Sequence, residues 1–145
     1  MSTLRSAVMF SLLMAVAANT FAADFPTAPA NQKEAEAKGL QRANLEELKK
    51  FIPGIMDLEG FKGILHKMTY KPDGSYVGTG FDPKNSTGKW HFDDKNNTYC
   101  HTKYVRNRNE DYCFAVFRAP DGINFFDYDI KDGFYAHVWH PAIGE

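Results

Sequence analysis

The spacing of hydrophobic residues changes once along the chain, from a helical period to an alternating one. Leucine and isoleucine recur on one face over 45–52, behind Asn44 and Glu47, which have the spacing of a helix capping box. The pair Pro53 and Gly54 then predicts the end of this segment, because neither residue continues a helix well. We therefore expect one short α-helix ahead of the remaining elements.

From Gly60 onward apolar and polar residues alternate in short runs, as in β-strands, and each run ends at a cluster of turn residues. The predicted strands are 64–70, 75–81, a run around Trp90 and Phe92, 99–105, 111–118, 123–130 and 134–139. Even spacing of this kind is typical of an antiparallel meander. The sequence thus predicts a mainly β domain of about seven or eight strands, closed as a small barrel or folded as a sandwich, with a short N-terminal α-helix.

Residues 1–22 have the layout of a signal peptide. Arg5 precedes an almost unbroken apolar run over 7–18, and Thr20-Phe21-Ala22 supplies a small-x-small cleavage site. The apolar run is shorter than the roughly 20 residues that a membrane-spanning helix needs. We expect a periplasmic or secreted protein with no membrane span.

Behind this leader, residues 23–43 are predicted to form a flexible or partly helical lead-in, and 44–145 a single β-rich domain. Removal of Arg5 with the leader leaves 16 basic residues against 18 acidic ones, a net charge of −2 with neutral histidines. A chain with this balance has no strongly basic face, which argues against nucleic acid as a partner.

The cysteines Cys100 and Cys113 fit a disulfide across one hairpin. If Val105 and Arg108 flank a two-residue turn, Cys100 lies directly opposite Cys113, at a site without backbone hydrogen bonds where the strands approach most closely. A pair of cysteines in an exported chain favours the same bridge. The alternative, a catalytic or metal-binding thiol, lacks an accompanying CxxC motif.

Several short motifs together carry a resemblance. Phe51-Ile52-Pro53-Gly54, Tyr70 to Gly74, Tyr76-Val77-Gly78 and Gly88-Lys89-Trp90 precede the two cysteines, and an aromatic-rich strand follows. This order resembles small exported proteobacterial domains of unknown function with a Gly-x-Trp strand and two following cysteines. The resemblance implies a lipocalin-like or calycin-like β structure over roughly residues 44–140. It differs from a true lipocalin, since Trp90 lies in the third predicted strand rather than the first, and it lends no catalytic residue.

A high aromatic content suggests a ligand-binding interior. The chain has 12 Phe, 7 Tyr and 2 Trp, which either fill a small barrel or receive a small apolar ligand. The candidate lining residues of such a cup are Tyr76, Trp90, Phe92, Tyr104, Phe117 and Trp139. On this hypothesis the protein is a non-catalytic binding module without a cofactor.

An alternative function is interaction with another envelope protein, as an inhibitor or assembly factor on a solid barrel. Loops on a rigid scaffold commonly carry recognition, and the exposed candidates are 82–89 and 106–111.

A third hypothesis is metal binding through His91, His101 and His137, provided that neighbouring strands bring them to one face. His140 follows His137 by three positions and is expected on the opposite face.

The remaining polar clusters do not form a known catalytic motif. Asp127 and Asp129, followed by Asp132-Gly133, fail the spacing of an EF-hand and are expected to form a solvated edge and a hairpin turn. Glu59 and these aspartates would supply two carboxylates for glycosidase chemistry, but nothing singles them out. The chain has no GxSxG elbow. We therefore expect that the protein is not an enzyme.

Overall fold

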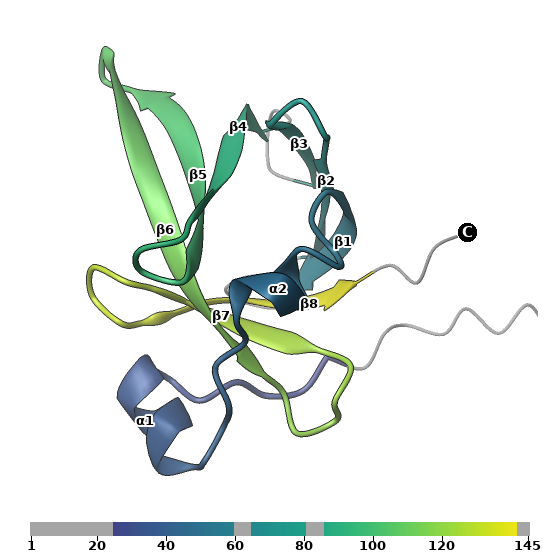
Figure 1. Cartoon of the computed structure of the whole chain (residues 1–145), viewed down its shortest axis with the longest axis vertical. Helices are drawn as coiled ribbons and strands as arrows, with labels where there is room; N and C mark the ends of the chain where they lie inside the picture. Colours follow the sequence, from purple (N-terminus) through teal and green to yellow (C-terminus); the bar gives the residue numbers. More distant parts are fainter. Residues whose placement is uncertain (1–24, 60–64, 81–85, 142–145) are drawn as a thin grey trace, which may run out of the picture.

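The computed structural model describes residues 25–59, 65–80 and 86–141, and these form a closed antiparallel barrel (Figure 1). Eight strands in the described part of the chain pair in sequence order. Their bounds are β1 Gly54–Glu59, β2 Leu65–Tyr70, β3 Ser75–Thr79, β4 Ser86–Asp93, β5 Thr98–Val105, β6 Arg108–Arg118, β7 Phe125–Asp129 and β8 Tyr135–Pro141. Two short helices, α1 Gln32–Ala37 and α2 Leu45–Leu48, precede them. The predicted fold class is confirmed, whereas the predicted signal peptide lies outside the described residues.

The barrel closes through β1, a strand that the turn signals did not reveal. Met56 pairs with Met68 on β2 and with Pro141 on β8, so the first and last strands complete the ring of hydrogen bonds. The segment GIMDLE follows directly on the predicted end of the helix, and its few apolar positions do not establish a period by themselves. Closure leaves no unpaired edge in the described sheet.

The predicted hairpin and its disulfide are confirmed. Val105 pairs with Arg108, and Arg106 and Asn107 between them have positive φ angles of 47° and 65°, as a two-residue hairpin turn requires. Cys100 lies opposite Cys113 with a Cα–Cα distance of 4.0 Å, and the two sulfur atoms are bonded. The register that follows from the turn thus brings the cysteines together.

Helix α2 covers one end of the barrel. Asn44 and Glu47 form the capping box, and Phe51, just beyond the helix, packs edge-on against Phe125 and Trp139 with ring centroids 5.6 and 6.4 Å apart. Those two rings are themselves stacked at 4.5 Å. This end of the barrel is therefore filled by aromatic side chains from the helix segment and from β7 and β8.

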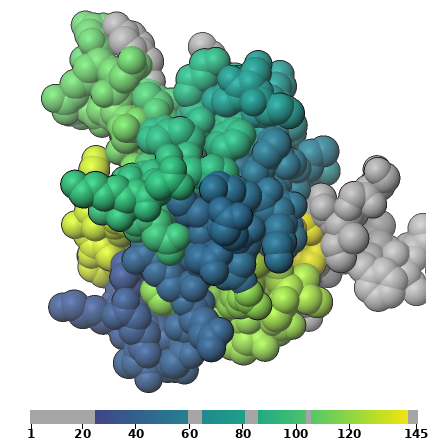
Figure 2. Space-filling model, viewed as in Figure 1, coloured from purple at the N-terminus to yellow at the C-terminus, as the bar shows by residue number. Residues whose placement is uncertain are grey.

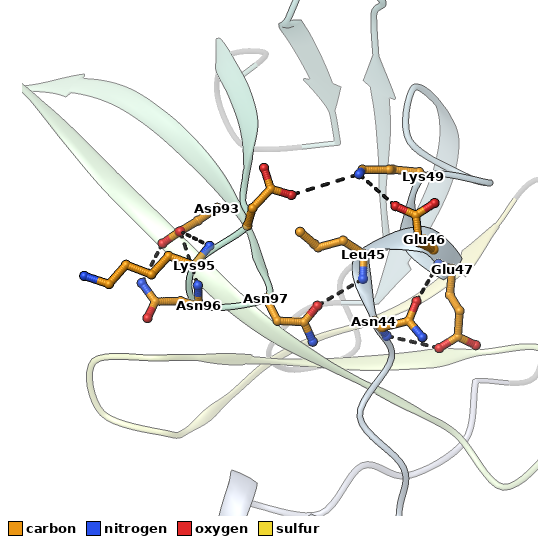
Figure 3. A network of polar contacts seen from close by, with 10 residues as sticks. Asn44, Leu45, Glu46, Glu47, Lys49, Asp93, Lys95, Asn96 and Asn97 are labelled. Atoms are coloured by element: carbon orange, nitrogen blue, oxygen red, sulfur yellow. Dashed lines mark hydrogen bonds and ion pairs between the residues drawn. The ribbon is translucent and has the colours of Figure 1, made fainter.

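Polar contacts hold α2 against the turn between β4 and β5 (Figure 3). The Asn97 side chain accepts a hydrogen bond from the Leu45 amide at 3.0 Å and donates one to the Ala43 carbonyl at 3.2 Å. Lys49 forms an ion pair with Asp94 across the same contact. The helix segment and this turn lie side by side on the face shown in Figure 2.

The Gly-x-Trp motif of β4 is explained by packing inside the barrel. A Cβ atom on Gly88 would lie 2.8 Å from a ring carbon of Tyr76 and 2.6 Å from the Thr102 carbonyl oxygen, so only glycine lets the Tyr76 ring cross this strand. The Trp90 indole donates a hydrogen bond to the Lys71 carbonyl at 2.9 Å. The motif thus joins β4 to β3 and to the β2–β3 turn.

A second hydrophobic cluster lies on the outer face of β6, β7 and β8. Segment 25–43, which includes α1, packs on this face and forms isolated bridges at Asn31–Phe134 and Arg42–Phe117. Ala35 of α1 is fully buried there. Because this segment covers the outside of the barrel, both faces of these three strands carry buried side chains.

Loss of the disulfide is expected to destabilise the barrel without changing its fold. The double variant Cys100→Ala/Cys113→Ala should lose about 3 kcal/mol in free energy of unfolding, since the bridge limits the entropy of the unfolded hairpin. Urea unfolding monitored by tryptophan fluorescence measures this change. Reduction of the wild-type protein should give the same loss in the same assay, and a change below about 1 kcal/mol would contradict this account.

Candidate functional site

The candidate site is a cavity of about 220 Å³ at the end of the barrel opposite α2. Most of its lining residues lie in the halves of their strands that are farther from α2. The lining residues are Leu58, Met68, Ser86, His101, Lys103, Tyr112, Phe114, Asp129 and His137. This volume is below the roughly 300–1,000 Å³ of pockets for drug-sized ligands, so the cavity suits a small molecule.

Strand alternation turns these side chains inward. Cross-strand partners share a face, and the register pairs His101 with Tyr112 and with Trp90. The β5–β6 hairpin, which extends beyond the rest of the barrel in Figure 1, supplies the wall that carries Lys103 and Tyr112. Apolar side chains such as Leu58 occupy part of the same inner surface, so the cavity is amphipathic.

A chain of polar contacts lies in the wall beside the cavity. Asp127 is fully buried, and its Oδ2 accepts a hydrogen bond of 2.6 Å from the Tyr99 hydroxyl. Its Oδ1 lies 3.2 Å from Nδ1 of His137. A buried carboxylate is costly unless hydrogen bonds and a countercharge compensate for lost hydration, and Tyr99 and His137 provide both.

The carboxylate controls the ionisation of His137. Burial alone would lower the pKa of His137, but the negative charge of Asp127 and their hydrogen bond outweigh burial and raise the pKa above the usual 6.5. Because the folded-state pKa exceeds the unfolded value, the stability gained is fully present below the unfolded pKa. It is lost as pH rises through the higher folded pKa.

His101, unlike His137, favours its neutral form. Its Nε2 lies 2.8 Å from the Tyr70 hydroxyl, and its ring stacks on Tyr76 at 4.7 Å between centroids. Burial, assisted by the charges of Lys103 and His137, lowers the pKa of His101 to about 3. His101 is therefore a neutral, hydrogen-bonded part of the wall at physiological pH.

Lys103 contributes a basic side chain to the cavity lining. Burial lowers the pKa of Lys103 below its usual value, because desolvation disfavours the ammonium form. Its Nζ lies 5.6 Å from the centre of the Tyr112 ring, a cation–π distance. Among the described residues, no carboxylate forms an ion pair with Lys103 and no side chain hydrogen-bonds to it.

The sequence-predicted lining residues lie elsewhere in the barrel. Tyr76 and Trp139 are fully buried in the inner core, with Trp90 and Phe92 partly buried against it. Phe117 belongs to the outer cluster beneath segment 25–43, which corrects the prediction that it faces inward. The Tyr104 side chain lies outside the described part of the structure. None of the described members of this set lines the cavity itself.

The predicted histidine site does not assemble. Trp90 and His101 are cross-strand partners on the inner face, so the exposed His91 lies on the outer face and only His101 and His137 reach the cavity. No group of three or more candidate metal ligands occurs within the ranges that the structure describes. His140 instead lies 2.9 Å from the Asn124 side-chain oxygen.

The acidic cluster divides into two environments. Asp129 and Asp132 accept hydrogen bonds from the amides of Lys131 and Phe134, as turn residues do. Asp127, expected at a solvated edge, is fully buried, so that prediction is wrong. One signal in the sequence could have indicated the site. Asp127, His137 and His101 are polar residues at inward positions of strands, where apolar residues are usual.

A larger hollow of about 370 Å³ lies at the α2 end of the barrel. Phe51, Ile123 and Phe125 line it together with Glu47 and Arg118, which form an ion pair. It is more open and contains none of the buried titratable groups described above. The cavity at the opposite end therefore remains the better candidate for a specific small-molecule site.

Comparison with known proteins does not assign a function to the site. Against protein-family models, curated proteins and solved structures, the chain finds no match. Among the described residues, no helix combines the length and apolar character needed to cross a membrane.

Removal of the Asp127 charge is expected to lower the pKa of His137. In Asp127→Asn the amide keeps the shape and can still accept from Tyr99, but burial of His137 is no longer opposed by a negative charge. An NMR pH titration of the His137 ring should show a pKa below 6.5 instead of above it. Asp129→Asn is the control and should leave the raised pKa in place. An unchanged pKa in Asp127→Asn would show that Asp127 does not control this histidine.

Proposed function

We propose that this protein is an exported, non-catalytic binding protein that takes up a small amphipathic molecule in the barrel end opposite α2. The observation that carries this proposal is the asymmetry of the barrel. At the α2 end the aromatic side chains around Phe51 fill the interior and leave only an open hollow beside the helix, whereas the opposite end contains a more enclosed cavity with apolar and polar walls. Closed eight-stranded barrels are able to hold one small ligand in this way.

The proposed location rests on the disulfide and the leader-like N-terminal sequence. The bonded pair Cys100–Cys113 is typical of an oxidising compartment such as the periplasm or the cell exterior. The lipocalin-like resemblance of the motifs agrees with a closed barrel, but fold by itself does not imply a ligand. The proposal therefore depends on the cavity.

Binding rather than catalysis is favoured by the state of the titratable side chains. Tyr99 and His137 hold Asp127 in the wall, and Tyr70 holds a neutral His101. These contacts fix the shape and polarity of the cavity. They are the kind of buried network that positions a ligand.

A second candidate function, docking of an envelope protein, is supported by the hollow beside α2. Ile123 is 52% exposed there, next to Phe51 and Phe125. Exposed apolar side chains around a groove are a feature of interaction sites. The two functions use opposite ends of the barrel, so substitutions at each end separate them.

A cavity-filling substitution tests the proposed function. Hexanol and hexanoate serve as probes of small amphipathic ligands, and titration calorimetry with the oxidised protein measures their binding. Met68→Trp places a larger side chain into the cavity wall and should abolish binding of both probes. Ile123→Trp, the matched control in the opposite hollow, should leave binding unchanged.

Thermal unfolding establishes that each variant is folded, and Leu58→Phe replaces Met68→Trp if overpacking prevents folding. If neither hexanol nor hexanoate bound to the wild-type protein, the proposed function would be contradicted. Loss of binding in Ile123→Trp but not in the cavity variants would instead assign binding to the hollow beside α2.

A further inference from the structure

Lys103 is a charged residue of the cavity lining that makes no ion pair with the described residues. Lys103 lies on the inner face of β5, where burial already disfavours its ammonium form. In the described structure it makes no ion pair, and the Tyr112 ring is its identified electrostatic partner. A partly buried cation that faces a cavity is stabilised by any anion that enters.

His137 presents a second cationic group to the same cavity. It reaches the cavity from β8, while Asp127 behind it favours its protonated form. Both side chains line the same cavity, and the charge of Lys103 opposes that protonation. An anion bound between Lys103 and His137 would offset this effect.

The carboxylates near the cavity accept hydrogen bonds, and the other histidines near it favour their neutral forms. Asp127 binds Tyr99 and His137, and Asp129 accepts a hydrogen bond of 2.7 Å from the Lys131 amide. Glu110, the cross-strand partner of Lys103, forms an ion pair with Arg108. Burial lowers the pKa of both His66 and His101, which favours their neutral forms. Lys103 and His137 are therefore the cationic donors that an anion entering the cavity would meet.

We propose that the ligand is a short organic acid whose carboxylate binds between Lys103 and His137. Its apolar body lies against Leu58, Met68 and Phe114 on the same inner surface. This inference rests on the proposed function, since it names the ligand class of that cavity. A carboxylate matches two cationic donors through charge-assisted hydrogen bonds.

Protonation of His137 makes recognition dependent on pH. As pH rises through the pKa of His137, the imidazolium loses its proton and one of the two cationic contacts is lost. The charged and titratable groups that face His137 are His66, His101, Lys103, Asp127 and Asp129. Of these, Asp127 and Lys103 act on His137 with opposite signs. Affinity for an organic acid should thus fall at alkaline pH, and affinity for a neutral analogue should not.

Three probes with the same hydrocarbon chain test the inference: hexanoate, hexanol and hexylamine. Calorimetric titration of the wild-type protein should give about tenfold or more tighter binding for hexanoate than for hexanol, with hexylamine weakest. Lys103→Met should reduce hexanoate binding to the level of hexanol and leave hexanol unchanged, whereas Lys103→Arg should retain the preference.

Lys131→Met is the matched control, because Lys131 lies at a similar distance from the same Tyr112 ring but does not line the cavity. It removes the same charge and should leave the ratio of hexanoate to hexanol affinity within about twofold. Equal binding of hexanoate and hexanol to the wild type, or an unchanged ratio in Lys103→Met, would overturn the inference while leaving the proposed function intact. Failure of all three probes to bind would overturn both.

Discussion

Pairing of β1 with β8 is the constraint on which the rest of the structure depends. Once Met56 is paired in register with Pro141 as well as with Met68, every strand has two neighbours and each inward side chain must fit a closed interior. The inner face then cannot hold large residues throughout. Gly88 has no side chain and so leaves space for the Tyr76 ring, and aromatic residues are packed together at the α2 end.

Closure also makes the two ends of the barrel different. Asn44 caps a helix of only four residues, which is held by Asn97 and places the segment bearing Phe51 over the aromatic end. At the other end, inward positions are taken by charged and hydrogen-bonding side chains. The space between these side chains forms the cavity.

Much of the fold could be predicted because turn chemistry and alternation are local properties. The hairpin turn at Arg106 and Asn107 fixes its register, and that register alone places Cys100 opposite Cys113. Strand β1 was not among the predicted strands, because its six residues have no clear alternation of their own and are defined as a strand by pairing with β2 and the distant β8. The number of strands thus depended on a contact between the two ends of the domain.

The site was harder to predict because residues 25–43 cover the outside of the barrel. Four successive residues of β6, Phe114 to Phe117, are buried, so alternation no longer tells inward from outward, and Phe117 was assigned to the wrong face. Asp127 was expected in solvent for a related reason: its partners Tyr99 and His137 come from other strands. A buried charge is visible in a sequence only when its partners are known.

The central claim is that a ligand binds inside the barrel, at the end where Lys103 and His137 meet, and not in the hollow beside α2. Intermolecular nuclear Overhauser effects between hexanoate and methyl-labelled protein test it most directly. The account predicts contacts from the hexanoate chain to the methyl groups of Leu58 and Met68. Contacts to the Ile123 methyl groups, with none to Leu58 or Met68, would contradict it.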